Sequence, residues 1–277
     1  RLRLLNKYHP INKKGCQNKN IQRKLIKKNI DSKKLFTVSK NYLVERGVIF
    51  FGGYANIQYL SKYSKKNVNK DIPDFDVISE KAEHDAKLFV NELRFSGFTS
   101  ARYKRMSNVD ETIPNHYQIE VIPNEIIAHI YESVACHSYN ILPGSESKPI
   151  KIATIDTMLS YYLYFLYTDK GYYDENRILC MIQYLFEVQE KYKYKQEGIL
   201  KRFNTKCDGY QKQKEDFMNE KSEKYEELKN KKNSKEYNEW FFTYRPKTKK
   251  NGDKSKKRSI TMKKRSIKKR KKNLKTF

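Results

Sequence analysis

Two short motifs contain residues whose types and spacing could hold a phosphorylated substrate and a metal ion. Gly52 and Gly53 follow the apolar run 48–51, and 20 residues later Asp74 and Asp76 frame Phe75. Backbone N–H groups at a glycine turn that opens a helix can approach phosphate oxygens closely, and the helix N-terminus favours negative charge. Two aspartates one residue apart on a strand point to the same side, where their oxygens can hold Mg²⁺. The pattern predicts a site for transferring a nucleotide.

Each half of this pattern also has a purely structural explanation. A Gly-Gly pair after an apolar strand is often only a tight turn, and an aspartate–x–aspartate pattern is common at solvated strand ends. Their occurrence together, in this order, is more specific than either alone. Tyr54 follows the glycines at the start of the expected helix. It is a further candidate for nucleotide binding, with packing on the sheet as its structural alternative.

Hydrophobic periodicity predicts the elements that position these residues. Helices are expected over 33–47, 54–63 and 83–93, and strands over 47–51, 74–79 and 98–103. Residues 117–122 and 125–134 are typical of a hairpin around Pro123-Asn124. Apolar helices over 154–168 and 174–192 and a charged helix over 212–232 complete the chain. The order predicts an α+β fold, with a mixed sheet and helices followed by a mainly helical domain.

Composition divides the chain into four segments. We expect an N-terminal remnant at 1–32, a catalytic domain at 33–150, a helical domain at 151–244 and a disordered basic tail at 245–277. The first segment is interpreted as the remains of a longer region because the chain begins with Arg1 rather than Met. The tail has no apolar periodicity with which to bury a core.

The positive charge is concentrated in the tail but is not confined to it. The tail holds 17 Lys and Arg against one acid, which accounts for +16 of the net charge of +27 and leaves +11 for the rest. The tail could be an RNA-gripping arm, a nuclear address or a solubility tail. An enzyme body with a charge of +11 is what a groove along an RNA backbone would require.

Cysteine usage and hydropathy favour an intracellular protein without a membrane partner. The residues Cys16, Cys136, Cys180 and Cys207 are widely spaced and form no C-x-x-C pair. Reduced thiols are therefore expected, rather than disulfides or a zinc site. No run of 18 apolar residues and no signal-peptide core occur in the sequence, so no transmembrane helix is predicted.

The motif order resembles the nucleotidyltransferase superfamily of the DNA polymerase β type, and several downstream segments resemble one family within it. These segments are IYESVACHSYN at 130–140, IATIDTMLS at 152–160, YYDENRILC at 172–180, GILKRF at 198–203 and EYNEWF at 236–241. They are similar to the catalytic subunit of the poly(A) polymerases of large nucleocytoplasmic DNA viruses. The resemblance covers about residues 40 to 246.

The resemblance implies a function, cofactors and partners. The activity would be the template-independent addition of AMP from ATP to RNA 3′ ends, with Mg²⁺ or Mn²⁺ as the cofactor and ATP as a substrate. RNA 3′ ends would be the second partner, and a homodimer is expected. The expected location is the virion and the host cytoplasm, where the virus factory lies.

The third catalytic carboxylate is the open question of the sequence. The superfamily places it on a neighbouring strand, and related viral enzymes carry an apolar-Ala-Asp-Ile motif there. The comparable stretch here is 127–130, so that His129 stands where Asp would be. Imidazole is a poor Mg²⁺ ligand. His129 is therefore either a core or edge histidine or a catalytic group.

Glu120 is the first candidate to replace this acid. If Pro123-Asn124 is a two-residue hairpin loop, residue 120 pairs with 127 and residue 118 with 129, so Glu120 and His129 share a face as diagonal neighbours. A loop one residue longer would break this pairing. Glu125 and Glu132 are weaker candidates.

The helical half offers further residues with two interpretations each. Arg177 could meet a phosphate or pair with Asp174, three residues earlier on the same helix. The apolar residues of 158–166 and 179–186 could form a core between two packed helices or a dimer face.

Three functions remain after the sequence is read. The first is poly(A) polymerase activity with Asp74, Asp76 and Glu120 as catalytic residues, Asp74 and Asp76 as metal ligands, and Gly52, Gly53 and Tyr54 at the nucleotide. The second is a catalytically degenerate RNA-binding relative. The third is a nucleotidyltransferase with another nucleotide or RNA substrate.

Overall fold

The computed structural model describes residues 30–63, 73–109, 113–142, 148–168, 170, 173–201, 204–210 and 213–242. All of them belong to one compact unit. Residues 1–29 and the basic tail expected at 245–277 lie outside the described residues. The division into domains at residue 150 stays a prediction.

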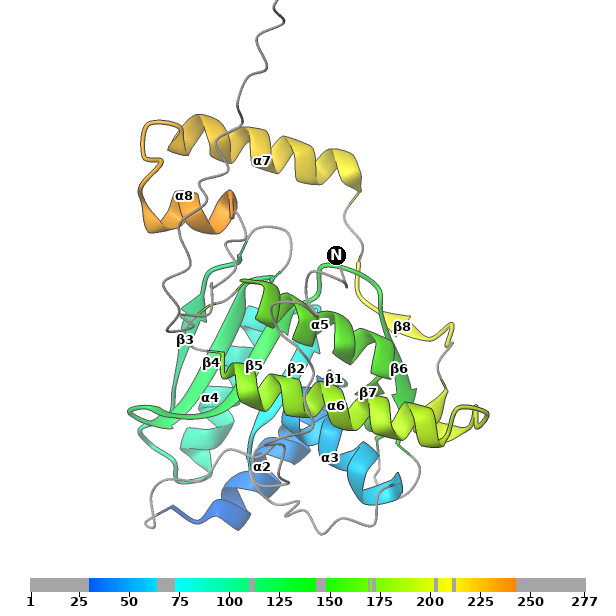
Figure 1. Ribbon diagram of the computed structural model, residues 1–277. Helices are drawn as coiled ribbons and strands as arrows, with labels where there is room; N and C mark the ends of the chain where they lie inside the picture. The colour runs from blue at the N-terminus through cyan, green and yellow to red at the C-terminus, as the bar shows by residue number, and fades with distance from the viewer. Residues whose placement is uncertain are drawn as a thin grey trace, which may run out of the picture. The chain divides into compact units, whose positions relative to one another are not determined.

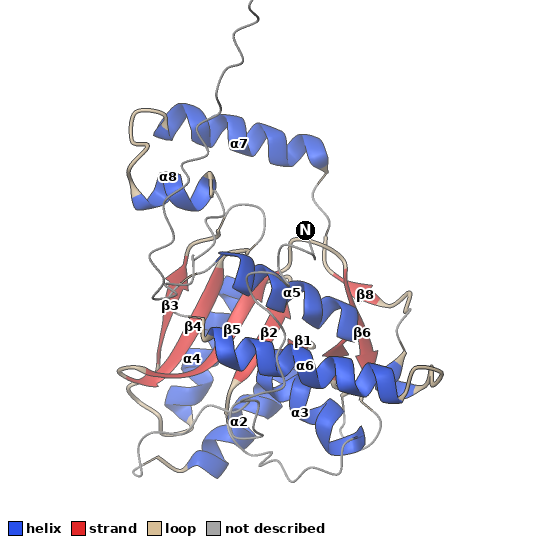
Figure 2. Cartoon of the chain, viewed as in Figure 1, coloured by secondary structure: helices blue, strands red, loops and turns tan. Residues whose placement is uncertain are grey.

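A mixed sheet forms the centre of the described structure (Figure 2). In spatial order its strands are β3 (Arg102–Met106), β4 (His116–Ile122), β5 (Glu125–Glu132), β2 (Phe75–Ser79), β1 (Ile49–Phe51), β7 (Lys151–Ala153), β6 (His137–Ile141) and β8 (Cys207–Asp208). The pairs β2–β5 and β1–β7 are parallel, and the other neighbours are antiparallel. The predicted α+β class with a mixed sheet is confirmed.

Helices cover both faces of this sheet. In Figure 1, α5 (Ile155–Thr168) and α6 (Glu175–Lys191) cross in front of the strands, and α4 (Ala82–Phe95) lies behind β4 and β5. The helix α3 (Gly52–Tyr63) contacts β1, β2 and α6, and α2 (Ser32–Glu45) contacts α4. A 3₁₀ turn (Gly198–Leu200), α7 (Lys214–Leu228) and α8 (Lys235–Trp240) follow α6. None of the described helices is long and apolar enough to cross a membrane.

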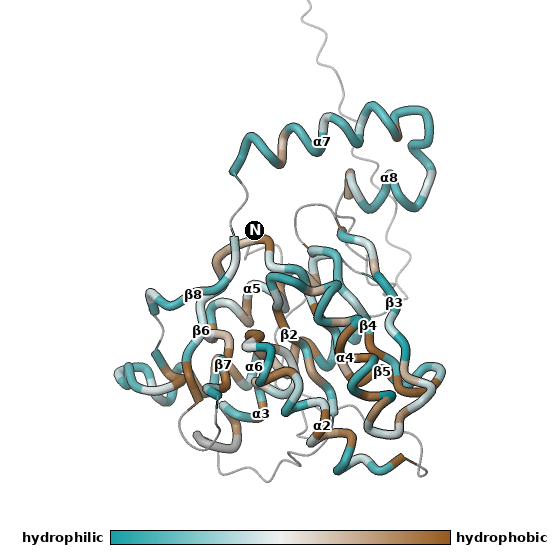
Figure 3. The backbone as a smooth tube through the Cα atoms, turned by 180° about the vertical axis from the view of Figure 1, so that it is seen from behind, coloured by the Kyte–Doolittle hydropathy of each residue, from teal (hydrophilic) through white to brown (hydrophobic). Residues whose placement is uncertain are grey.

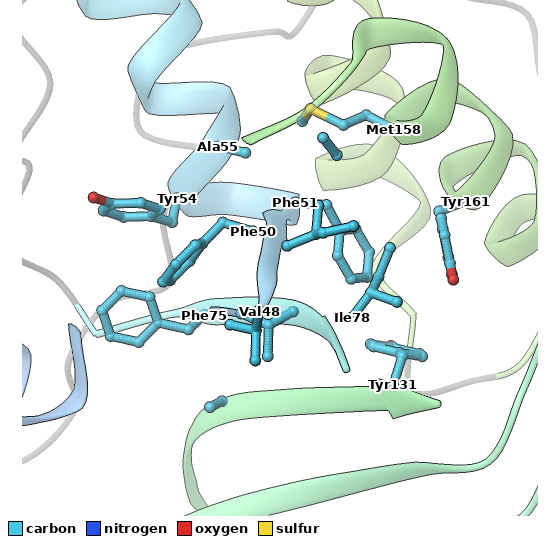
Figure 4. Close-up of a cluster of buried hydrophobic side chains, with 14 of the residues drawn as sticks. Val48, Phe50, Phe51, Tyr54, Ala55, Phe75, Ile78, Tyr131, Met158 and Tyr161 are labelled. Atoms are coloured by element: carbon cyan, nitrogen blue, oxygen red, sulfur yellow. The ribbon is translucent and has the colours of Figure 1, made fainter. Parts of the chain in front are cut away.

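Aromatic side chains fill the core where β1 enters α3 (Figure 4). The ring of Phe51 lies 5.3 Å from that of Tyr131 on β5 and 4.7 Å from that of Tyr161 on α5, measured between centroids. Phe50 packs against Tyr54 at 5.1 Å on the other side. Burying side chains of this size stabilises the fold by about 1.5–3 kcal/mol each. This packing fixes the strand-to-helix junction that carries Gly52.

Most elements lie where the sequence pattern placed them. The helices predicted over 33–47, 54–63, 83–93, 154–168, 174–192 and 212–232 are confirmed as α2 to α7, with shifted ends. The α7 helix has one buried residue, Leu228, and is coloured hydrophilic along most of its length in Figure 3. The expectation of a charged helix with little hydrophobic face is therefore confirmed.

The strand predicted over 98–103 is wrong at its start. The N–H of Ala101 donates to the carbonyl of Phe98 in a turn, and β3 begins only at Arg102. The strands β6, β7 and β8 were not predicted. The strands β7 and β8 have only three and two residues, and they pair with β1 and β6, which are distant in sequence. Both β7 and β8 fall in the segment where only helices were expected.

The hairpin of β4 and β5 follows the predicted two-residue loop. Asn124 adopts a positive φ of 68°, which closes the turn after Pro123. Gln118 pairs with His129 as predicted. Glu120 pairs with Ile126 rather than Ile127, because the register of the hairpin shifts by one residue after Ile119. The bulge changes the position of Glu120 relative to its neighbours.

The prediction of reduced cysteines is wrong for Cys136, Cys180 and Cys207, which are disulfide-bonded. Cys136 is joined to Cys207, and their Cα atoms are 5.3 Å apart. The pairing of β6 with β8 brings these residues together across 71 positions of sequence. Spacing along the chain could not reveal that strand pairing.

Candidate active site

Asp74 and Asp76 lie directly against the backbone of Gly52 and Gly53. A Cβ atom on Gly52 would overlap Oδ2 and Cβ of Asp76, and one on Gly53 would lie 2.9 Å from Oδ2 of Asp74. Gly52 also has a positive φ of 63°, which other residues rarely adopt. Antiparallel pairing of Phe51 with Asp76 holds the two motifs together. The structure thus brings all four predicted residues into one place.

Asp74 precedes β2, whereas Asp76 is its second residue. The prediction that both lie within one strand over 74–79 is therefore one residue too long at its start. Both residues are mostly buried, with side-chain exposures of 8% for Asp74 and 15% for Asp76. Burial makes their charge costly unless a partner or a cation compensates it.

His129 is the nearest partner of Asp76. The two residues pair across β2 and β5, and Nδ1 of His129 lies 3.1 Å from Oδ1 of Asp76. The carboxylate can only accept, so the imidazole donates through Nδ1. The sequence placed His129 where related enzymes carry the third acid, and the structure places it beside the aspartate pair. Its catalytic role stays a prediction.

Arg177 supplies the partner of Asp74 from α6, 103 positions away in sequence. Its Nη2 forms an ion pair with Oδ2 of Asp74. Burial lowers the pKa of Arg177, but the carboxylates of Asp74 and Asp76 outweigh that effect, so its pKa is raised overall. Asp174 caps α6 by accepting from the backbone N–H of Arg177 at 3.1 Å. The guanidinium of Arg177 therefore reaches the candidate site.

Tyr54 and Asn56 are both buried and have partners within the protein. Tyr54 is 5% exposed and packs against Phe50 and Phe75, with ring centroids 5.1 Å and 5.3 Å away. The amide of Asn56 donates to the hydroxyl of Tyr162 at 2.9 Å. Burial raises the pKa of Tyr162 well above its usual value. Tyr54 has the packing role that was its structural alternative, and its role in nucleotide binding stays a prediction.

The candidate third acids do not join Asp74 and Asp76. Glu120 forms an ion pair with Arg102 on β3, with 2.7 Å between Nη2 and Oε2. Glu132 accepts from the amide of Asn115 at 3.0 Å, and Glu125 is buried at the start of β5. Two strand boundaries separate Glu120 on β4 from Asp76 on β2. The role of Glu120 as a third ligand stays a prediction.

A cavity of about 220 Å³ opens beside Asp76, between the sheet and α5 and α6. On the sheet side its lining includes His116, Gln118 and His129. On the helix side it includes Phe165, Arg177 and Met181. Local sequence patterns did not single out His116 and Gln118. The alternation of β4 was the only available signal, since it puts residues 116 and 118 on the face of His129.

The oxygen donors of the site fit a magnesium ion held partly by its substrate. Among the described residues, no group of three or more His, Cys, Asp and Glu could hold a metal ion. Mg²⁺ is commonly bound by one or two carboxylates together with substrate phosphates and water. Asp74 and Asp76 supply such a pair beside Gly52 and Gly53, where phosphate is expected.

Known proteins share the fold but little sequence. No family model and no curated protein matches the chain. The polyadenylate synthase of Megavirus superimposes on 82% of this chain and 47% of its own, with a TM-score of 0.57 and 14% identity. The antibiotic-resistance factor ANT(2″)-Ia matches 57% of this chain and 89% of its own, with a TM-score of 0.32 and 12% identity.

The first of these likenesses establishes the fold. The chain spans about half the length of the Megavirus protein and shares its arrangement of strands and helices. The relationship to viral poly(A) polymerases that the motifs predicted is therefore supported at the level of the fold.

Proposed function

We propose that this chain is a metal-dependent nucleotidyltransferase that adds AMP from ATP to RNA 3′ ends. The observation that carries the proposal is the packing of Asp74 and Asp76 against Gly52 and Gly53 at the start of α3. A helix N-terminus attracts phosphate, and two adjacent carboxylates attract the metal that accompanies a triphosphate. The fold shared with the Megavirus polyadenylate synthase supports RNA as the acceptor.

The aspartates and the glycines of the site would bind different parts of the substrate. Asp74 and Asp76 would hold Mg²⁺, which supplies charge neutralisation at the phosphates and a lower pKa for the RNA 3′-hydroxyl. Gly52 and Gly53 have no side chain, so the triphosphate could approach their backbone closely. A Cβ atom at either position would also come too close to Asp76 or Asp74. The oxygen of the 3′-hydroxyl would attack the α-phosphorus and lose its proton to solvent, while the bond from the α-phosphorus to the bridging oxygen breaks and pyrophosphate leaves.

Arg177 would act on the phosphates after the nucleotide binds. In the present structure its guanidinium is paired with Asp74. A cation that pairs with Asp74 competes with a metal for the same carboxylate, so metal binding would release Arg177 toward the triphosphate. Its planar donors suit phosphate oxygens.

One observation favours a second candidate function, an RNA-binding relative without catalysis. Glu120 is held by Arg102, and His129 contacts Asp76 at the position of the usual third acid. An arrangement with two carboxylates and no third is what a decayed site would have. The body charge of +11 would still favour RNA.

Extension of a short labelled RNA, with each of the four nucleoside triphosphates and Mg²⁺ or Mn²⁺, tests these functions. We expect a ladder of adenylates from the wild type and none from the double variant Asp74→Ala/Asp76→Ala. A ladder built from another nucleotide would indicate a different nucleotidyltransferase. No extension, with RNA binding intact in a gel-shift assay, would establish the non-catalytic function.

The variant Glu120→Gln tests the third acid in the same assay. A loss of about 100-fold or more would make Glu120 a catalytic residue, by the usual effect of removing an acid or base. Unchanged extension would leave His129 as the group to examine. Arg102→Gln is the matched control, because it breaks the same ion pair while leaving the carboxylate present.

A homodimer and a location in the virion and host cytoplasm complete the proposal. Met158, Phe165 and Leu185 are buried within the chain, which is the core interpretation of the apolar helices. Phe186 and Tyr164 remain exposed at 42% and 41%, so a dimer contact on these helices would use such residues. Sedimentation velocity of the wild type and of Phe186→Ser would test the dimer.

A further inference from the structure

The cavity beside Asp76 has two chemically different walls. The sheet contributes His116, Gln118 and His129, whose side chains all carry hydrogen-bonding groups. The helices α5 and α6 contribute Phe165, Ile178 and Met181, which are apolar. A wall for stacking opposite a wall for hydrogen bonding suits a flat heteroaromatic ring.

Gln118 is the strongest sign of a missing ligand in this cavity. It is 8% exposed, and its amide has no hydrogen-bond partner among the described residues. Its amide atoms are not among the fully buried polar atoms of the described residues, so they border the open space of the cavity and are available to a ligand.

His116 adds a buried imidazole to the same wall. It is 1% exposed, and its Nδ1 is enclosed by protein. The backbone of Pro114 lies near enough to raise its pKa slightly, although no partner of Nδ1 in the described part of the chain meets strict hydrogen-bond geometry. The ring is stacked on Tyr131 with 4.5 Å between centroids, so its position is fixed. Burial, followed by the nearby His129, lowers the pKa of His116 to about 3. The imidazole is therefore neutral at physiological pH and offers one donor and one acceptor.

The strand register sets the distance between this wall and the aspartates. Asp76 pairs with His129, and His129 pairs with Gln118, so the three side chains form a row across β2, β5 and β4. Two strand spacings amount to about 10 Å. That is the length scale of a nucleotide between its α-phosphate and the far edge of its base.

The cavity is small enough to favour a single ring system over a whole nucleotide. Its volume of about 220 Å³ lies below the range of about 300–1,000 Å³ that is typical of drug-sized ligands. A phosphate held at Gly52 and Gly53 would lie outside it, since neither glycine lines the cavity.

We propose that this cavity takes the adenine ring of a nucleotide and that the Gln118 amide reads the edge of the ring. Glutamine can pair with adenine through two hydrogen bonds, accepting from the 6-amino group and donating to N7. The inference rests on the proposed function, because it assumes that a nucleotide lies at Asp76. The ring belongs either to the incoming ATP or to the 3′-terminal adenosine of the RNA.

Binding measurements test this site without requiring turnover. The affinity of the full chain is measured by titration calorimetry for ATP, for its analogue without the 6-amino group and for 7-deaza-ATP. We expect each analogue to bind the wild type about 10-fold more weakly, by the usual cost of a lost base contact. In Gln118→Leu all three should bind with the same affinity.

A second variant separates the two hydrogen bonds and guards against misfolding. Gln118→Glu keeps an acceptor for the 6-amino group but loses the amide donor. It should still discriminate against the analogue without the amino group and no longer against 7-deaza-ATP. Gln183→Leu is the matched control, because Gln183 is buried on α6, bonds Glu187 and does not line the cavity. That control should discriminate as the wild type does.

A parallel titration with RNA distinguishes the two sources of the ring. The RNAs end in adenosine or in purine riboside, which lacks the 6-amino group. Discrimination in RNA binding that is lost in Gln118→Leu would assign the cavity to the terminal base of the primer. If Gln118→Leu changes neither ATP nor RNA discrimination, the proposal is overturned and the cavity holds only water.

Failure of this site and failure of the proposed function give different results. A chain that shows base discrimination but never extends RNA keeps the site and loses the activity. A chain that extends RNA while Gln118→Leu discriminates as the wild type does keeps the activity and loses the site.

Discussion

The strands β1 and β2 form an antiparallel pair, and charged side chains surround a cavity at each end of this pair. The charged groups have different partners at the two ends. At one end Asp74 and Asp76 lie against Gly52 and Gly53, beside the cavity of about 220 Å³. At the other end a pocket of about 370 Å³ is lined by three cations and three acids, which are Arg46, Lys81, Lys151, Glu80, Asp85 and Asp208.

Five of these six charged groups at the second end have a partner in the described structure. Arg46 pairs with Asp85 at 2.6 Å, Lys151 pairs with Asp208, and Glu80 accepts from the backbone of Gly209 at 2.9 Å. The first end has the Gln118 amide, which borders the cavity and makes no hydrogen bond within the described structure. Charge alone therefore does not mark a functional site, whereas a polar group that lines a cavity and lacks a protein partner points to a ligand.

The largest difference between the ends should appear when one aspartate is removed from each. Asp76→Ala is expected to lower RNA extension by at least about 1,000-fold, as losses of essential catalytic groups do. Asp208→Ala removes a partner of Lys151 and should leave extension within about twofold of the wild type. Single-turnover extension rates at saturating ATP measure both. Equal losses in the two variants would contradict the assignment of the active end.

The two ends also differ in what their glycines tolerate. Gly52 and Gly47 have similar positive φ values of 63° and 67°. A Cβ on Gly52 would overlap Asp76, whereas a Cβ on Gly47 would meet only Nζ of Lys151 at 3.9 Å. Gly52→Ala should therefore displace Asp76 and slow RNA extension by about 100-fold, the typical cost of misplacing a catalytic group by about 1 Å.

Gly47→Ala is the matched control for this prediction. Both alanines carry the left-handed backbone strain of about 1–2 kcal/mol, which urea unfolding measures. Both variants should lose a similar amount of stability, but only Gly52→Ala should extend RNA more slowly when it is folded. A comparable loss of activity in Gly47→Ala would mean that strain, rather than the collision with Asp76, is responsible.

The sequence predicted the first end because its motifs are local. The Gly-Gly turn and the aspartate pair are each contained within three residues, and the antiparallel pairing of β1 with β2 brings them together. The hairpin loop likewise predicted the pairing of Gln118 with His129. Short-range rules of turn length and strand alternation were sufficient there.

The residues that sequence analysis missed depend on distant contacts. Arg177 meets Asp74 across 103 positions, and no local pattern distinguishes that pair from a helical pair with Asp174. The register shift at Glu120 makes Ile126 its partner instead of residue 127, and the alternation of strand residues could not predict that shift. The disulfide between Cys136 and Cys207 depends on β8, a strand of two residues. Strand pairing over long separations decides all of these features.

A substitution of Asp85 tests whether the charged residues at the second end contribute to stability rather than to catalysis. It is 2% exposed, accepts from Ser79 at 2.5 Å and pairs with Arg46. Asp85→Asn removes the charge while keeping the shape. Since Arg46 is one-third exposed, we expect a loss of about 2 kcal/mol, below the cost of a fully buried pair. Urea unfolding measures it, and the extension rate of the folded variant should not change.

The two ends also differ in how their stability depends on pH. Burial keeps His116, on the Asp76 side, neutral in the folded protein down to about pH 3, whereas its pKa in the unfolded chain is near 6.5. Below pH 6.5 the unfolded state binds a proton that the folded state does not. Stability present above that pH is therefore lost on acidification, by about 1.4 kcal/mol per pH unit.

His116→Gln should remove that part of the acid sensitivity, because glutamine does not titrate. Urea unfolding of the wild type and the variant at pH 7.5, 6.0, 5.0 and 4.5 gives two slopes of stability against pH. Their difference isolates His116, since all other groups titrate in both proteins. A difference of about one proton is expected, and equal slopes would mean that His116 becomes protonated in the folded state. In that case His116 could no longer be a neutral member of the cavity wall, and Gln118 would remain as the single reader of the base edge.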